Sequence, residues 1–109
     1  MLFEIYLVPF PFNDKLAKKV RPALILTEPV GEFNEVVISF ISSKKLSLSY
    51  STDVYIDKEY QSCGLQKPSI IRLHKLITLP KTHLLEKIGI LNSLYHSAVK
   101  QKMQHLFHF

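Results

Sequence analysis

The first two thirds of the chain consist of short runs of β-branched and aromatic residues, separated by residues that favour turns. Such runs predict strands rather than helices. We expect strands over residues 3–8, 20–27, 35–41, 50–56 and 69–79, the last of which forms one or two strands. The loop over 42–49 is polar and basic, and the loop over 57–68 turns at Gly64. This pattern predicts a small β-barrel or tightly bent sheet, because closure protects the edges of a sheet.

A different periodicity begins near the C-terminus. Asn92 is a favourable N-cap residue, and apolar residues follow it at spacings of three and four. These residues are Tyr95, Ala98, Val99, Met103 and Leu106. We therefore expect a C-terminal α-helix that packs one face on the sheet. The predicted fold class is mainly β with a terminal helix, and 109 residues suit a single domain over 1–109.

Composition excludes several classes of protein. No run approaches the roughly 20 apolar residues that a membrane span needs, and the N-terminus lacks the basic region and cleavage site of a signal peptide. The single cysteine, Cys63, excludes an internal disulfide and a site with several cysteine ligands. Four histidines show no metal-ligand spacing, namely His83, His96, His105 and His108. We expect a cytoplasmic protein that contacts no membrane and needs neither metal nor cofactor.

The charge of the chain is uneven. The net charge is +5, but residues 1–59 hold seven basic and eight acidic residues, whereas residues 60–109 hold seven basic residues and one acidic residue. Such asymmetry indicates an anionic partner, of which nucleic acid is the usual one. The alternative is a basic surface that only aids solubility.

Arg21 is one of only two arginines in the chain, and it precedes Pro22. A residue before proline is confined to extended backbone, so this guanidinium has a fixed origin. Guanidinium is planar, always charged and able to bind two phosphate oxygens at once. The position therefore suits a phosphate contact. The alternative is a structural salt bridge with Glu4 or Asp14.

The second arginine, Arg72, lies two residues before His74 in a predicted strand. Alternate residues of a strand share a face, so the two side chains lie about 6–7 Å apart. A cation beside an imidazole suits phosphoryl-transfer chemistry. The alternative is that both are ordinary polar residues on the wet face of a half-exposed strand.

Two hydroxyl residues, Ser42 and Ser43, end the strand over 35–41 and precede Lys44 and Lys45. A hydroxyl at a strand end can donate a hydrogen bond to a phosphate oxygen. Hydroxyl residues at this place are also common turn formers, and the turn is the simpler interpretation.

Several fragments, in this order, resemble the MazF/PemK family of toxin endoribonucleases. They are IYLVPFPFNDK (5–15), VRPALIL (20–26), VVISFISS (36–43), GLQKPSIIRLHKL (64–76) and KIGIL (87–91). The resemblance implies an SH3-like barrel of the MazF/PemK/CcdB type, a homodimer and metal-independent cleavage of single-stranded RNA. It also implies a small antitoxin whose disordered tail covers the RNA groove. Contact with DNA is then expected only indirectly, through the antitoxin complex.

The resemblance assigns roles to individual residues. Arg21 is the arginine of the RPA motif, Ser42 is the hydroxyl residue at the end of the third strand, and Arg72 begins the R-x-acid motif of PemK-like members. The segment PFPFNDKLAKK becomes the basic lip of the RNA groove. The expected RNA-binding residues are Glu4, Phe12, Asp14, Lys15, Lys18, Lys19, Ser43, Lys44 and Lys45. Phe10, Phe12 and Tyr50 are candidates for stacking on bases, although the barrel core is the better interpretation of Phe10.

Two residues depart from the family pattern. Phe3 stands where the first strand usually begins with glycine, which predicts an altered entry into the barrel. His74 stands where PemK-like members carry an acid. An unperturbed histidine has a pKa of about 6.5, so it suits proton transfer near neutral pH.

The expected reaction is attack of a ribose 2′-hydroxyl on the adjacent phosphorus. His74 is the candidate base, with Glu4 as the second candidate. Arg21 and Arg72 stabilise the phosphorane, one of them also protonating the leaving group, and Ser42 donates to a non-bridging oxygen. Two other functions remain open. One is a binding module without catalysis, and the other is a CcdB-type toxin directed at gyrase.

Overall fold

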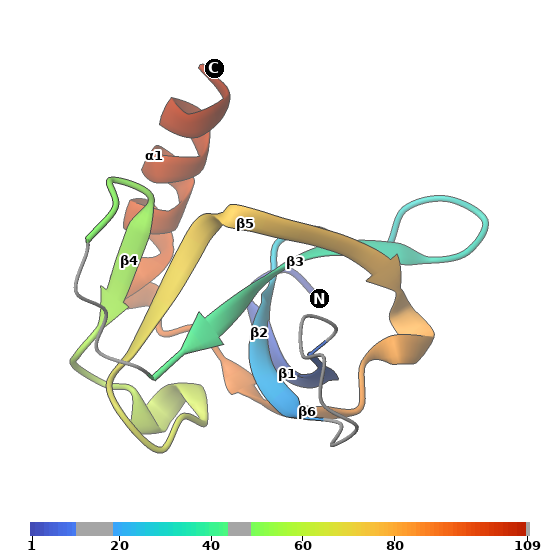
Figure 1. The fold of residues 1–109 in the computed structure, drawn as a ribbon, viewed down its shortest axis with the longest axis horizontal. Helices are drawn as coiled ribbons and strands as arrows, with labels where there is room; N and C mark the ends of the chain where they lie inside the picture. Colours follow the sequence, from blue (N-terminus) through green and yellow to red (C-terminus); the bar gives the residue numbers. More distant parts are fainter. Residues whose placement is uncertain (11–18, 44–48, 109) are drawn as a thin grey trace.

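A single curled sheet of six strands, followed by one α-helix, makes up the structure (Figure 1). The computed structural model describes residues 1–10, 19–43 and 49–108. The strands are β1 (Glu4–Pro9), β2 (Val20–Ile25), β3 (Glu35–Ser42), β4 (Asp53–Ile56), β5 (Ser69–Pro80) and β6 (Glu86–Ile90), and the helix is α1 (His96–Phe107). Their order in the sheet is β4-β5-β3-β2-β1-β6, with every pair antiparallel. The predicted fold class, mainly β with a terminal helix, is confirmed.

Strand β5 is bent where its pairing with β3 changes register. Ser39 pairs with Leu76, but Ile41 pairs with Ile71, so residues 72–75 lie opposite the single residue Phe40. Figure 1 shows β5 turning sharply at this place. The first arm of β5 also pairs with β4, while the second arm continues along β3. The segment that the sequence allowed to be one or two strands is therefore one strand with two arms.

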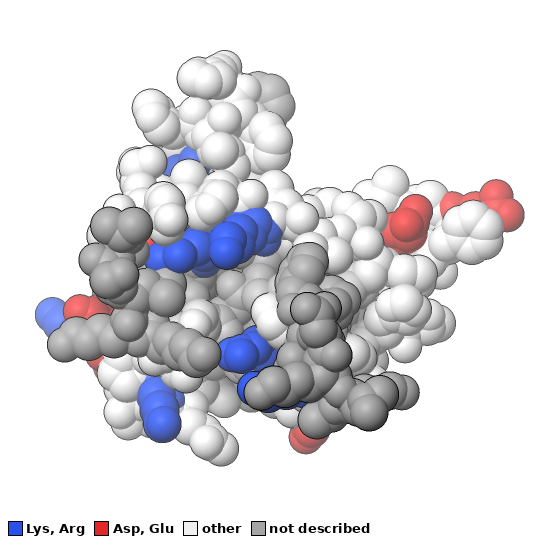
Figure 2. All heavy atoms as spheres, viewed as in Figure 1, with Lys and Arg blue, Asp and Glu red and all other residues white. Residues whose placement is uncertain are grey.

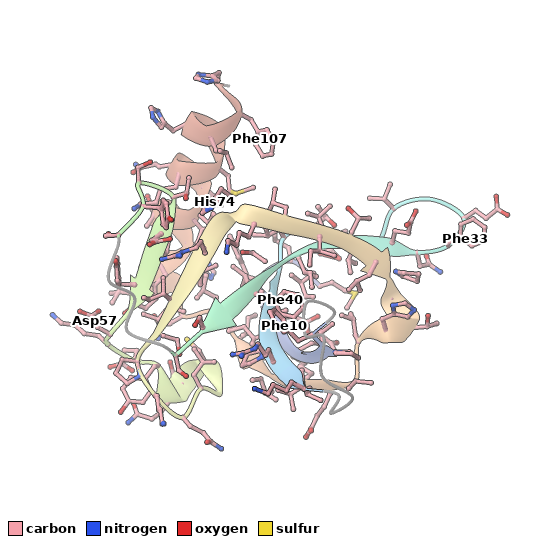
Figure 3. The ribbon with its side chains drawn as sticks, in the orientation of Figure 1. Phe10, Phe33, Phe40, Asp57, His74 and Phe107 are labelled. Carbon is pink, nitrogen blue, oxygen red and sulfur yellow. The ribbon has the colours of Figure 1, made fainter. Side chains whose placement is uncertain are left out.

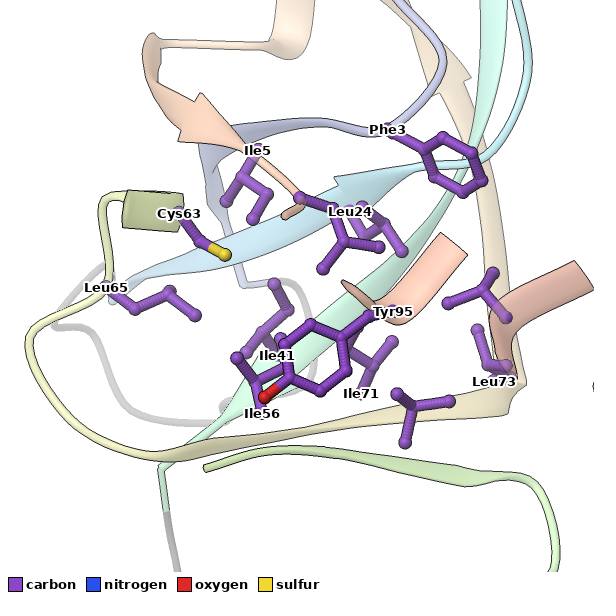
Figure 4. Close-up of a cluster of buried hydrophobic side chains, with 13 residues drawn as sticks. Phe3, Ile5, Leu24, Ile41, Ile56, Cys63, Leu65, Ile71, Leu73 and Tyr95 are labelled. Atoms are coloured by element: carbon purple, nitrogen blue, oxygen red, sulfur yellow. The ribbon is translucent and has the colours of Figure 1, made fainter. Parts of the chain in front are cut away.

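The core has two parts. The larger cluster, shown in Figure 4, includes Leu24 of β2, Ile41 of β3, Ile71 and Leu73 of the first arm of β5, and Leu91 after β6. The smaller cluster consists of Val8, Ala23, Ile25, Val36 and Ile38, with the second arm of β5 packed against it through Ile77 and Leu79. Each arm of β5 thus rests on its own set of buried side chains.

Helix α1 packs on the larger cluster through the face that the sequence predicts. Val99 is buried, Met103 is partly buried against the cluster, and Tyr95 is buried just before the helix. Tyr95 belongs to a short 3₁₀ turn, Ser93–Tyr95, whose Leu94 amide donates to the side chain of Asn92 at 2.9 Å. Asn92 therefore caps this turn, and the α-helix proper begins one turn later than the cap predicts.

Phe3 has a backbone φ of 69°, which is the left-handed region. Its amide donates to the Ile25 carbonyl, and its carbonyl accepts from the Leu91 amide, each at 2.8 Å. Its ring stacks on His96 with centroids 4.1 Å apart. A side chain in this region costs about 1–2 kcal/mol, which explains why glycine suits the position. The stacked ring and both backbone hydrogen bonds hold Phe3 in place, and the altered entry into the barrel stays a prediction.

Candidate functional site

A cavity of about 560 Å³ opens beside the bend of β5. It is lined by Phe10, Arg21, Phe40, Ile41, Ser42, Ile70, Arg72, His74, Lys75, Leu76 and Ile77. Strands β2, β3 and β5 supply most of these side chains, because the curled sheet brings their ends together. All four residues that the sequence assigns to catalysis line this one cavity.

Basic side chains dominate the face of the molecule around this cavity. Figure 2 shows Lys and Arg gathered over the middle of the face, while most Asp and Glu lie toward its rim. Arg21, Arg72 and Lys75 line the cavity, and no Asp or Glu is among its described lining residues. The cavity therefore presents positive charge beside apolar walls. Such a surface suits a ligand in which a negatively charged group is attached to aromatic rings.

Arg21 is oriented by an aromatic ring. Its guanidinium carbon lies 4.7 Å from the centroid of the Phe10 ring, and Phe10 in turn makes an edge contact with Phe40 at 5.1 Å. Figure 3 shows Phe10 and Phe40 beside each other near the centre of the view. The Nε atom of Arg21 is buried and has no hydrogen-bond partner among the described residues. A buried donor without a partner is costly, so an acceptor that reached this atom would stabilise it.

The alternative for Arg21 was a structural salt bridge. Glu4 pairs instead with Lys87 and with the N-terminal amine, and it lines neither this cavity nor the neighbouring one. The hydrogen bond from Lys87 lowers the pKa of Glu4. Asp14, the other candidate partner, lies outside the described residues. The contacts of Glu4 give it a structural role that the sequence did not suggest.

Arg72 is held by a buried carboxylate on the neighbouring strand. Asp53 of β4 lies opposite Arg72 in the register. Its Oδ1 accepts from Arg72 Nε at 3.0 Å and its Oδ2 from Nη2 at 3.2 Å. The Asp53 side chain is 0% exposed, and Oδ2 also accepts from the Tyr50 amide at 3.0 Å. The guanidinium lies over the Tyr50 ring, 4.4 Å from its centroid, so its plane is fixed from two sides.

Sequence reasoning missed Asp53. The signal is present, because an acid follows a turn and then opens a strand whose next residues are apolar. Asp53 also connects the site to helix α1, since Lys102 Nζ donates to the Asp53 carbonyl at 2.7 Å. Strand β4 begins at Asp53, so Tyr50 lies in the preceding turn and not in the strand expected over 50–56.

His74 shares a face of β5 with Arg72, as strand alternation predicts, and both line the cavity. Its Nδ1 lies 2.7 Å from Thr52 Oγ1, and its ring centroid lies 5.2 Å from that of Tyr50. Nε2 has no hydrogen-bond partner within the described part of the chain. When Nδ1 carries the proton and donates to Thr52, Nε2 has a lone pair that can accept a proton.

The remaining predicted residues fall into two groups. Phe12, Asp14, Lys15, Lys18, Lys44 and Lys45 lie outside the described residues. Ser42 ends β3 opposite Ile70 and is half-buried, whereas Ser43 and Lys19 are exposed beside the site. Phe10 lies at the wall of the cavity and in neither buried cluster, so the core interpretation of this residue is wrong.

The described residues hold neither a cluster of metal ligands nor a membrane-spanning helix. Within residues 1–10, 19–43 and 49–108, no three His, Cys, Asp or Glu side chains come together in a way that could hold a metal ion. The helices in the same residues are too short or too polar to span a bilayer.

Comparison with protein families shows to which family the chain belongs. The family described as PemK-like, MazF-like toxin of type II toxin–antitoxin system matches residues 2–107. The chain belongs to this toxin family. The match covers every described element, so the cavity at the bend of β5 lies within the family domain. A comparison with curated proteins gave no match.

Solved structures agree with this membership. The toxin MazF-mt6 of Mycobacterium tuberculosis is 25% identical, with a TM-score of 0.74 over 97% of both chains. An endoribonuclease of a mycobacterial species, solved in complex with its cognate antitoxin, has a TM-score of 0.76 at 12% identity, over 100% of this chain and 95% of that one. An Mtb toxin has a TM-score of 0.66 at 24% identity, over 91% and 97%. The barrel is thus a MazF-like fold.

Proposed function

We propose that the chain is an endoribonuclease toxin that cleaves single-stranded mRNA with a sequence preference and without a metal ion. One observation carries the proposal. Two arginines, a hydroxyl and an imidazole line the same cavity, and each arginine is oriented by an aromatic ring. A phosphodiester needs such cations, because negative charge develops on its oxygens during cleavage.

The two arginines have different roles in this proposal. Arg21 binds a non-bridging oxygen of the scissile phosphate, since its buried Nε lacks a partner among the described residues. Arg72 is already neutralised in part by Asp53, so it contributes a fixed donor rather than a full unpaired charge. Ser42 donates to the second non-bridging oxygen from the end of β3.

The reaction follows from these positions. His74 Nε2 takes the proton of the ribose 2′-hydroxyl, and the 2′ oxygen forms a bond to phosphorus. The bond from phosphorus to the 5′ oxygen breaks, and the 5′ oxygen takes a proton from one of the two arginines, which regains a proton from water. The products are a 2′,3′-cyclic phosphate and a 5′-hydroxyl. Phe10 and Tyr50 remain the candidates for stacking on the flanking bases, because each ring lies beside one of the arginines.

We also propose the partners that the family suggests. A cognate antitoxin covers the basic cavity and keeps the toxin inactive, as the related mycobacterial complex with an antitoxin supports. The toxin acts as a homodimer in the cytoplasm. The toxin contacts DNA only indirectly, as part of a complex with the antitoxin.

Incubation of the full chain with a long single-stranded RNA in EDTA tests the proposal. Wild type should give fragments with 5′-hydroxyl ends, and Arg21→Ala should not. Lys100→Ala is the matched control, because Lys100 is exposed on α1 and lines neither cavity. Intact RNA with wild type would refute the activity and favour a binding module or a gyrase-directed toxin.

A further inference from the structure

A second cavity, of about 430 Å³, adjoins the first. The two cavities share Arg21 and Ile41 in their linings. The second is lined by Leu7, Val20, Arg21, Pro22, Ile41, Ser43, Gly64, Leu65, Gln66, Lys67, Ser69 and Ile88. Nothing in the chemistry described above uses this space. Arg21 therefore stands between an assigned cavity and an unassigned one.

The lining of the second cavity combines apolar walls with a few polar groups. Pro22 and Ile88 supply flat or apolar surface, and Gln66 and Lys67 supply polar groups that are exposed to solvent. A glutamine amide both donates and accepts, so it can pair with the edge of a base. No Asp or Glu is among the described residues of the lining, which favours a ligand that carries phosphate.

The turn that carries Gln66 and Lys67 is closely packed against β6 at its start. A Cβ atom on Gly64 would lie 1.9 Å from the Ile88 carbonyl oxygen, and one on Gly89 would lie 2.1 Å from the Cys63 carbonyl oxygen. The backbone after Cys63 is thus pressed against β6. Ser69 Oγ closes the turn by donating to the Lys67 carbonyl at 2.8 Å. Side chains on such a fixed turn can discriminate between ligands, because little ordering is needed on binding.

A phosphodiester joins two nucleosides. Arg21, which binds the phosphodiester in the proposed function, lines both cavities. We infer that the two nucleotides flanking the scissile phosphate occupy the two cavities, one in each. The nucleotide in the second cavity has its base edge read by Gln66, while Lys67 contacts the next phosphate along the strand. Gln66 is thus a specificity-determining residue. This inference rests on the proposed ribonuclease function.

Cut-site mapping with Gln66→Ala tests the inference in the full chain. A pool of single-stranded RNA with random sequence is cleaved, and the fragments with 5′-hydroxyl ends are sequenced. Gln66→Ala should weaken the base preference by about tenfold at one nucleotide beside the cut, since a good base contact discriminates by about 5- to 150-fold. Preferences at other positions should persist. Gln61→Ala is the matched control, because Gln61 is exposed on the neighbouring turn and lines neither cavity.

Lys67→Ala has a different expected result. Binding of a non-cleavable RNA, with a 2′-O-methyl group at each ribose, should weaken equally for all sequences. The slope of log affinity against log salt should fall by about 1, because one phosphate contact is lost. Lys58→Ala, another exposed lysine that lines neither cavity, should leave the slope unchanged.

The outcomes separate the two proposals. Absence of cleavage by wild type would refute the ribonuclease function itself. Cleavage by wild type together with an unchanged preference in Gln66→Ala would refute only the role of the second cavity. The same role would be refuted if Gln66→Ala kept the cut sites but was no longer inhibited by the antitoxin. The second cavity would then bind the antitoxin and not RNA. Thermal unfolding of each variant checks that the fold is intact.

Discussion

The guanidinium of Arg72 is bound on two of its nitrogens by the buried carboxylate of Asp53, across the β4–β5 pair. The motif of PemK-like toxins places an acid two residues after this arginine, where the present chain has His74. Asp53 supplies a carboxylate from the neighbouring strand instead, and His74 contacts Thr52. Strand β4 and the turn before it thus provide a partner for Arg72 and a partner for His74.

Asp53→Asn should destabilise the fold and impair cleavage together. Removing one partner of a buried ion pair costs about 3–5 kcal/mol, because the other charge is left uncompensated. We expect a loss of about 3 kcal/mol in the free energy of unfolding, measured by chemical denaturation. Asp57→Asn is the control, since Asp57 is exposed and forms no salt bridge within the described residues. An unchanged stability of Asp53→Asn would show that the pair is unimportant to the fold.

Arg21→Lys should lose most cleavage while keeping the charge. Lysine lacks the planar fork that binds two oxygens and stacks on a ring, and Arg21 stacks on Phe10. Losing one such donor lowers the rate by about 10²–10³-fold. The rate of single-turnover cleavage measures this. A lysine variant with the wild-type rate would mean that only the charge matters.

His74→Ala should slow cleavage by about 10²–10⁴-fold, which is the usual contribution of a general base. Added imidazole should restore part of the rate, because the open cavity can admit the missing ring. The measurement is the cleavage rate against imidazole concentration, with Arg72→Ala as the variant that imidazole cannot rescue. Failure of rescue would point to a structural role for His74.

Low pH should weaken the ion pair between Glu4 of β1 and Lys87 of β6. The hydrogen bond from Lys87 lowers the pKa of Glu4 from its ordinary value of 4.5. A lowered carboxyl pKa contributes stability above the ordinary value, and that contribution is lost as the pH falls through the lowered one. Glu4→Gln should therefore reduce the unfolding midpoint at about pH 7, and the difference from wild type should shrink as the pH falls below the ordinary carboxyl pKa. A difference that is constant with pH would contradict this.

Phe3→Gly should destabilise the protein less than Phe3→Ala, which reverses the usual order. Both variants lose the ring that stacks on His96. Only glycine relieves the left-handed backbone at φ 69°, and the relief is worth about 1 kcal/mol. Thermal unfolding of the two variants gives the comparison. Ile5, in the extended strand β1, provides the control position, where alanine should be the better tolerated residue.

Strands β1 to β5 were predictable from the sequence because β-branched and aromatic runs coincide with them. Strand β6 was not expected, since Glu86–Ile90 contains two charged residues and a glycine. The grouping of Arg21, Ser42, Arg72 and His74 followed from the family resemblance, and their common cavity agrees with it. Asp53 could not be found in this way, because cross-strand partners depend on register. The register between β3 and β5 changes at Phe40. No local pattern of residues in the sequence predicts such a change. Phe10 was assigned to the core because hydrophobicity does not tell a cavity wall from an interior.

The bend of β5 has a consequence for how the toxin can change over time. One arm rests on the larger cluster through Ile71, the other on the smaller cluster through Ile77, and the cavity lies where the arms meet. A conservative change such as Ile77→Val, at a half-buried residue that packs on the smaller cluster and lines the cavity, can therefore shift one wall of the cavity while the other stays in place. The shape of the cavity can thus change through substitutions in the packing beneath β5, while Arg21, Ser42, Arg72 and His74 remain the same.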